Sequence, residues 1–311
     1  MRALLGRLAS LIPTLFLATA GVFLLLQLVP GDPAVAIAGE QANVEQLAEI
    51  REQLGLNDPI HLQYWNWLSR ALQGDLGTSL VSGESVVDAI RRTLFSTMQL
   101  VAGALFTAVV IGVPAGVASA RRADTVADTV ITSAASAGVA MPSFWIGLIL
   151  VSVFAVQLGW LPATGLVEIT SDPWLALKHL TLPAIALGAV AAAEVVRQLR
   201  AAMIDVLSSD HVRTLRAKGI GERRIVWRHA LKGAAVPLVT IVGLQVSRLL
   251  GATVVVETVF GVSGLGTLVV HATQTRDYPV VQGVVLVMAL MVVFANFAVD
   301  VSYRLLDPRI K

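Results

Sequence analysis

Six long apolar stretches constrain the fold of this chain more than any other feature of its sequence. A helix needs about 20 mostly apolar residues to cross a bilayer, so each stretch is a candidate span. Hydrophobic residues make up 56% of the 311 residues and charged residues only 14%, too little charge to coat a soluble protein of this size. We predict an all-α integral membrane protein. Its six transmembrane helices cover about Leu8–Leu28, Thr97–Ala118, Ile131–Val156, Leu182–Val196, Ala234–Val256 and Val280–Val301.

The first stretch has a second interpretation as a cleavable signal peptide, with Ala18-Thr19-Ala20 as the cleavage site. Its apolar run continues through Val22–Leu26, which is longer than the usual core of a signal peptide. We therefore predict an uncleaved first span.

Basic residues set the orientation, because loops that carry more Lys and Arg stay in the cytoplasm. With six spans, 16 of the 23 Lys and Arg residues fall on the side of the N-terminus, six fall on the opposite side, and Arg248 lies inside the fifth span. We predict a multi-pass membrane protein with both termini in the cytoplasm.

The chain is predicted to have four parts: the N-terminus with the first span (1–29), an outer segment (30–96), a five-helix core (97–304) and a short cytoplasmic tail (305–311). The outer segment shows helical spacing over Val44–Leu54 and Ile60–Leu72, and a third short helix is expected to lead into the second span. We interpret it as a small helical cap. The alternative is a hairpin whose Tyr64, Trp65 and Trp67 lie at the headgroup level.

The core contains a cytoplasmic loop, 205–233, that is longer than a turn between spans requires. Its sequence predicts a helix with Val212 and Leu215 on one face and Arg213 and Arg216 on the other, broken by glycines at 219 and 221. A short helix of this kind suits docking on a soluble partner. The alternative is a basic loop that only fixes the orientation of the spans.

Motifs for catalysis and metal binding are missing from the sequence. None of the four lysines, Lys178, Lys218, Lys232 and Lys311, stands in the Gly-Lys-Ser/Thr pattern of a phosphate-binding loop. There are no cysteines, and the five histidines are scattered. We predict no enzyme activity, no metal and no cofactor bound by this chain.

Charged residues inside apolar spans are candidates for function. Glu194 and Arg197 are three residues apart, and Asp300 and Arg304 four apart, so each pair is expected to meet on one helix face. Arg248 and Glu257 are nine apart, about half a turn around the helix from each other. We predict that Arg248, and with less support Glu257, lines a translocation path.

Several motifs along the chain together resemble the permease subunits of bacterial ABC importers, in the peptide/nickel family related to dipeptide and oligopeptide permeases. The resemblance rests on LVPGDP (28–33), REQLGLNDP (51–59), GDLGTS (74–79), HVRTLRAKG (211–219), RHAL (228–231), ETVF (257–260), GLG (264–266) and RDYPVVQG (276–283).

This resemblance implies a type I importer permease with a coupling helix at 211–219. Its expected ATPase-coupling residues are Val212, Arg213, Thr214, Leu215, Ala217, Lys218 and Gly219. Arg213 stands where the generic importer pattern has glutamate, and Leu215 where alanine is common. The implied partners are a second homologous permease in a heterodimer, two ATPase subunits that bind ATP and Mg, and an external peptide-binding protein. Beyond these we expect membrane lipid and no nucleic acid as partners.

The resemblance therefore implies an ATP-driven importer of peptides, in which this chain forms half of the path. The alternatives are a secondary transporter or a channel subunit that works without ATPase partners. Paired broken helices, which many secondary transporters use, are not apparent in the fourth and fifth spans.

Overall fold

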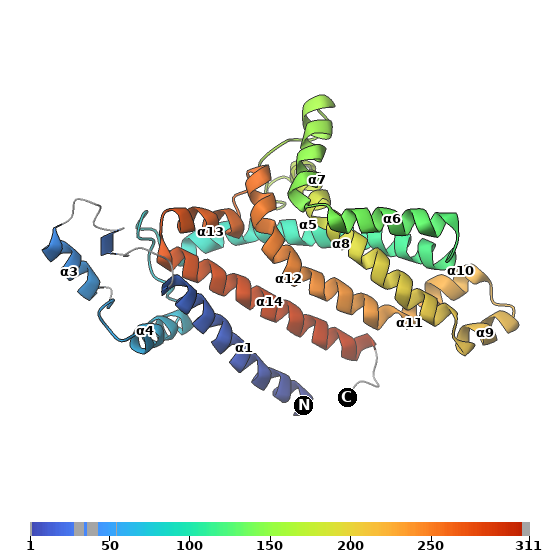
Figure 1. Ribbon diagram of the computed structural model, residues 1–311, viewed down its shortest axis with the longest axis horizontal. Helices are drawn as coiled ribbons and strands as arrows, with labels where there is room; N and C mark the ends of the chain where they lie inside the picture. The colour runs from blue at the N-terminus through green and yellow to red at the C-terminus, as the bar shows by residue number, and fades with distance from the viewer. Residues whose placement is uncertain (1, 28–33, 36–42, 54, 307–311) are drawn as a thin grey trace. The chain divides into compact units, whose positions relative to one another are not determined.

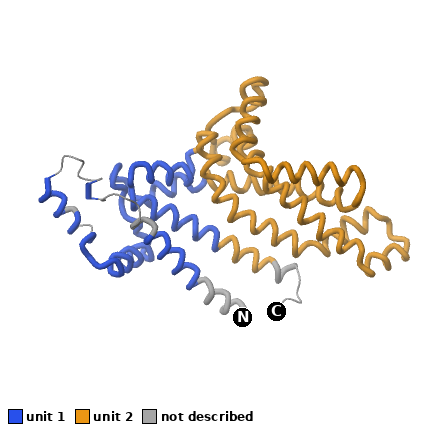
Figure 2. The backbone as a smooth tube through the Cα atoms, in the orientation of Figure 1, with its two compact units in different colours: residues 1–95, 263–293 blue, residues 96–262, 294–311 orange. Residues whose placement is uncertain are grey.

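The structure is a computed structural model that describes residues 2–27, 34–35, 43–53 and 55–306 (Figure 1). Two compact units can be distinguished (Figure 2): residues 1–95 with 263–293, and residues 96–262 with 294–311. The helices are α1 (Arg2–Gln27), α3 (Val44–Gln53), α4 (Ile60–Leu72), α5 (Val86–Arg121), α6 (Val126–Ala140), α7 (Ser143–Leu150) with a π-helical continuation (Val151–Gln157), α8 (Pro173–Leu207), α9 (Asp210–Ala217), α10 (Glu222–Arg224) with a π-helical continuation (Ile225–Ala230), α11 (Leu231–Gly233), α12 (Ala235–Phe260), α13 (Leu265–Gln274) and α14 (Tyr278–Leu306).

The all-α membrane architecture is confirmed. In the described part of the chain, four helices are long and apolar enough to cross a membrane, namely α5, α8, α12 and α14. The bent pair formed by α6 and α7 with its continuation gives a fifth candidate, and α1 contributes a shorter apolar helix, Ile12–Leu24. The count of six spans remains a prediction.

The helix that contains the fourth predicted span extends beyond it at both ends. The sequence suggested about Leu182–Val196, but α8 has 35 residues, from Pro173 to Leu207. The Asp172 carboxylate caps its first turn by accepting hydrogen bonds from the backbone N–H groups of Trp174 (3.1 Å) and Leu175 (3.0 Å). Pro183 lies inside the helix without ending it, as membrane helices allow when neighbouring groups satisfy the freed backbone.

The segment predicted as the third span consists of two helices with a sharp bend between them. α6 ends at Ala140 and α7 begins at Ser143, and the two helices are bent by 102°. The break falls at Met141-Pro142, where Met141 is extended with ψ 127°. A residue before proline is driven out of the α conformation, and this explains the break.

The third short helix predicted in the outer segment is not separate from the second span. One helix of 36 residues, α5, runs from Val86 to Arg121. No glycine or proline occurs between Val86 and Ala102, so nothing in the sequence ends the helix there.

Small residues bring α5 and α8 into close contact. A Cβ atom added to Gly188 of α8 would lie 2.6 Å from the Ala104 carbonyl oxygen of α5, and one added to Gly112 would lie 2.8 Å from Val195 Cβ. Membrane helices gain their association from such backbone approach. α8 is accordingly the core of its unit, with 67% of its apolar window buried.

In the other unit, the predicted outer helices are confirmed as α3 and α4, although Leu54 lies outside the described residues. Gly55 and Gly74, which follow these helices, have φ of +66° and +83°, as glycines that end helices commonly do. α4 packs on α1: Trp67 is buried with Phe23, and the Tyr64 and Thr19 hydroxyls form a 2.9 Å hydrogen bond.

A second core in this unit joins the start of α5 to α13 and α14 through Val86, Ile90, Leu265, Ala272, Val280 and Val284. Asp277, which is 4% exposed, precedes α14. Its carboxylate accepts hydrogen bonds from the Ser79 hydroxyl and the Leu80 backbone N–H, so it fixes the segment between α4 and α5.

Candidate functional site

The predicted docking helix is α9 (Asp210–Ala217), and its two faces differ as expected. Val212 and Leu215 are buried and pack with Ile225, while Arg213, Thr214, Ala217 and Lys218 are exposed. The coupling residues inferred from the family resemblance therefore divide into two groups. Val212 and Leu215 hold the helix to the rest of the chain, and the others form its outer face.

Gly219 ends α9 in a left-handed conformation with φ +73°. The Gly219 N–H donates to the Arg216 carbonyl at 2.9 Å, and the Ile220 N–H donates to the Leu215 carbonyl at 3.2 Å. This pair of bonds is a Schellman motif, and Ile220 packs beside Leu215 as the motif requires. The sharp corner after the helix thus depends on a residue without a Cβ atom.

An exposed ion pair closes the same corner. The Arg216 Nε donates to the Glu222 carboxylate at 2.6 Å, which joins α9 to α10 across the two glycines. The hydrogen bond from Arg216 lowers the pKa of the Glu222 carboxyl below its ordinary value, against the opposing effect of partial burial. Glu222 also borders a shallow hollow with Gly221, Arg223, Arg224 and Trp227.

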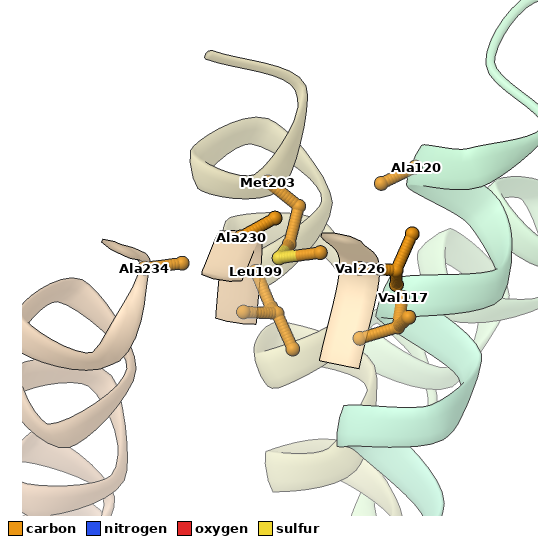
Figure 3. Packing of buried hydrophobic residues seen from close by; sticks show 7 residues of the cluster. All are labelled: Val117, Ala120, Leu199, Met203, Val226, Ala230 and Ala234. Carbon is orange, nitrogen blue, oxygen red and sulfur yellow. The ribbon is translucent and has the colours of Figure 1, made fainter. Parts of the chain in front are cut away.

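The chain after α10 anchors this docking segment to the membrane helices (Figure 3). Ile225 faces α9, and the next residue, Val226, packs with Ala230 against Leu199 and Met203 of α8 and Val117 of α5. Successive side chains therefore bind the docking helix on one side and two long helices on the other. The segment after α10 thus packs against α9 on one side and against α5 and α8 on the other, with close-packed contacts on both.

Arg248, predicted to line a path, lies near the middle of α12. Its guanidinium Nη1 donates to the Glu194 carboxylate of α8, and the Gln245 Nε2 donates to the same oxygen at 2.8 Å. The predicted local pair of Glu194 with Arg197 is wrong: Glu194 faces α12, while Arg197 is exposed on α8. The Arg304 side chain lies outside the described residues, so its pairing with Asp300 remains a prediction.

Glu257 differs from Arg248 in its surroundings. It is fully buried, and its carboxylate accepts a 2.6 Å hydrogen bond from the Thr97 hydroxyl of α5. This hydrogen bond stabilises the contact between α5 and α12, and it leaves the Glu257 carboxylate away from the surface of the chain. Of the two residues predicted to line the path, Glu257 is buried and Arg248 is exposed.

A third polar cluster was not singled out from the sequence. Asp128 of α6 accepts hydrogen bonds from Arg200 of α8, from the Ser119 hydroxyl of α5 and from the backbone N–H of Asp124. The partners Asp128 and Arg200 are 72 residues apart, so no helical spacing reveals the pair. In the described part of the chain, no group of three His, Asp or Glu side chains could hold a metal ion.

Sequence comparison identifies the family to which these features belong. Residues 112–311 match the family described as binding-protein-dependent transport system inner membrane component, and residues 1–101 match the N-terminal part of such membrane components. The chain is 42% identical over 305 residues to the glutathione transport system permease protein GsiC of Escherichia coli (strain K12), covering 98% of this chain and 97% of the relative. The corresponding protein of Salmonella choleraesuis (strain SC-B67) is 42% identical over 307 residues, covering 99% of this chain and 98% of the relative.

Solved structures agree with this assignment at the level of the fold. An inward-facing form of the MetNI methionine ABC transporter matches 70% of this chain and 96% of its own, with a TM-score of 0.60 at 18% identity. The native crystal form of the same transporter matches with a TM-score of 0.57 at 19% identity. These matches confirm the type I permease fold.

The relatives are permease subunits, so ATP hydrolysis and substrate capture belong to partner proteins of such systems. This chain belongs to the binding-protein-dependent transport system inner membrane component family and is a multi-pass inner-membrane permease subunit of an ABC importer.

Proposed function

We propose that this permease subunit imports peptides, forming half of a membrane path whose other half is a second, homologous permease. The observation that carries the proposal is the 42% identity, over 98% of the chain, to permeases named for glutathione transport. Glutathione is a tripeptide, so we infer that the path of this chain also accepts short peptides. We infer that an external peptide-binding protein delivers the substrate.

The exposed face of α9 is the proposed contact with the ATPase subunits, through Arg213, Thr214, Ala217, Lys218 and Gly219. The buried residues Val212 and Leu215 support this face from behind. ATP and Mg bind to the ATPase subunits, and closure of the ATPase dimer moves α9. The packing of Val226 and Ala230 against α5 and α8 carries that movement into the spans.

Substitution of Gly219 tests the coupling role, with Gly221 as a matched control. Both glycines have open space where a Cβ atom would be placed, but φ is +73° at Gly219 and −62° at Gly221. Valine at a positive φ is strongly disfavoured, so Gly219→Val should abolish uptake while membrane insertion remains intact. Gly221→Val should retain uptake. Unimpaired uptake by Gly219→Val would remove the support for α9 as the coupling helix.

The partner set is tested by purification from membranes in mild detergent. Two ATPase subunits and a second permease should co-purify with the tagged chain, and the loaded peptide-binding protein should raise ATP hydrolysis. Uptake by the purified chain alone, without ATPase subunits, would instead favour a secondary transporter or a channel.

Competition uptake assays define the substrate. Labelled glutathione uptake should be inhibited by unlabelled glutathione and by di- and tripeptides, but not by free amino acids. Inhibition by nickel complexes or haem in place of peptides would contradict the proposed substrate class.

A further inference from the structure

One face of α12 is exposed along the length of the helix and carries a single charge. Its exposed residues recur every three or four positions: Leu244, Arg248, Gly251 and Val255. The Arg248 side chain is 60% exposed, and a Cβ atom added to Gly251, almost one turn further on, would meet nothing within 4 Å. The stripe therefore combines an accessible guanidinium with open room beside it.

A guanidinium in the middle of an apolar span has a limited choice of surroundings. Exposure of a charge to hydrocarbon is unfavourable, so such residues face protein or a water-filled cavity. Within the described chain, Glu194 neutralises Arg248 from the α8 side, and its own side chain is only 17% exposed. The charge is thus held in place and still faces outward.

The geometry around Glu194 fixes the pair. One carboxylate oxygen of Glu194 accepts from both the Arg248 Nη1 and the Gln245 Nε2, and Gln245 is 4% exposed. A guanidinium has five N–H donors in a planar fork, and the contact with Glu194 uses Nη1. The exposed edge of the fork has the shape that binds a carboxylate with two parallel hydrogen bonds.

We propose that Arg248 binds a carboxylate of the transported peptide during passage and that Glu194 is its resident counter-ion. Glu194 keeps Arg248 neutralised when the path is empty and competes with the substrate carboxylate when the path is occupied, so the substrate is held and then released. This inference rests on the proposed peptide substrate and adds a chemical preference: substrates with an accessible carboxylate pass more readily than matched neutral ones.

The test compares a peptide with its C-terminal amide in proteoliposomes that contain the whole transporter. Both are supplied at saturating concentration on the same external binding protein, so its own selectivity cancels when variants are compared. The wild type should transport the acid several-fold faster than the amide. Arg248→Gln should bring the ratio of acid to amide uptake close to 1.

Two further variants keep the test decisive. Arg248→Gln leaves Glu194 hydrogen-bonded to Gln245 but without a neutralising charge. The double variant Arg248→Gln/Glu194→Gln removes both charges and should show the same loss of preference in a stable chain. Leu244→Ala, on the same exposed stripe, should keep the wild-type ratio.

Each outcome decides the matter. An unchanged ratio in both Arg248 variants would overturn the carboxylate site and leave peptide import intact. Loss of the second permease from the purified double variant would place Arg248 at a subunit contact and also overturn it. Transport of neither peptide by the wild type would overturn peptide import itself, and this inference with it.

Discussion

Asp128 in the first turn of α6 accepts two hydrogen bonds from the Arg200 guanidinium of α8, at 2.7 Å to Nε and 2.5 Å to Nη2. Ser119 of α5 donates to the same carboxylate, so one buried group joins three helices. The Asp128 side chain is 5% exposed and the Arg200 side chain 26%. The two partners therefore have unequal access to water.

This inequality predicts different effects of removing each partner. Arg200→Gln leaves an unpaired buried carboxylate and should destabilise the chain by roughly 3 kcal/mol. Asp128→Asn leaves an arginine that can reach water, so its cost should be smaller. Thermal unfolding in detergent measures both, and a larger loss for Asp128→Asn would contradict this account of the cluster.

Gly243 of α12 is predicted to be essential for contact with α14. A Cβ atom there would lie 2.0 Å from Val299 Cγ2, so Gly243→Ala requires the Val299 side chain or the two helices to shift. Overpacking of this kind costs about 1 to 3 kcal/mol. Val299→Ala in the same chain should restore part of the loss, and Gly251→Ala, which has open space on the same helix, should be nearly neutral in thermal unfolding.

The ion pair between Arg216 and Glu222 is predicted to make the corner after α9 sensitive to acid. Because the pKa of Glu222 is lower in the folded chain, the pair adds stability above the carboxyl's ordinary pKa and loses it as the pH falls through the folded value. Both side chains are about half exposed, so the effect should be under about 1 kcal/mol and weaker in high salt.

The absence of cysteine from the sequence allows a direct measurement at this corner. A spin label on a cysteine introduced at the exposed Lys218 should become more mobile as the pH falls below the ordinary pKa of a glutamate carboxyl. Glu222→Gln, which mimics the protonated carboxyl, should show the mobile spectrum already at neutral pH. An identical pH response in this variant would exclude Glu222 as the titrating group.

Asp277 is predicted to hold the segment before α5 in place. Asp277→Ala removes the acceptor for the Ser79 hydroxyl and the Leu80 N–H, which should cost about 1 to 3 kcal/mol locally. Protease added outside intact spheroplasts should then cleave within residues 74–85 faster than in the wild type. Ser82→Ala, in the same turn, is the control. Protection of this segment in every variant until the membrane is opened would contradict the predicted orientation.

The sequence by itself determined the class of this protein and the position of the two-faced helix α9. Apolar length gives membrane helices, and the spacing of Val212 and Leu215 against Arg213 and Arg216 gives a two-faced helix, because both depend on residues close in the chain. The end of that helix at Gly219 was equally readable, since only glycine adopts a positive φ there at little cost.

Other features depended on contacts between distant segments. Helix α8 is 35 residues long and continues through Pro183, where it packs closely against α5. Glu194 pairs with Arg248 of α12 and not with Arg197, and Asp128 with Arg200 of α8. Local spacing shows which charged residues could meet on one helix. The packing of the helices decides which pairs form, because a buried charge needs a partner and the neighbouring helix supplies it. The tertiary structure therefore separated the buried Glu257 from the exposed Arg248, which the sequence alone had placed together as path candidates.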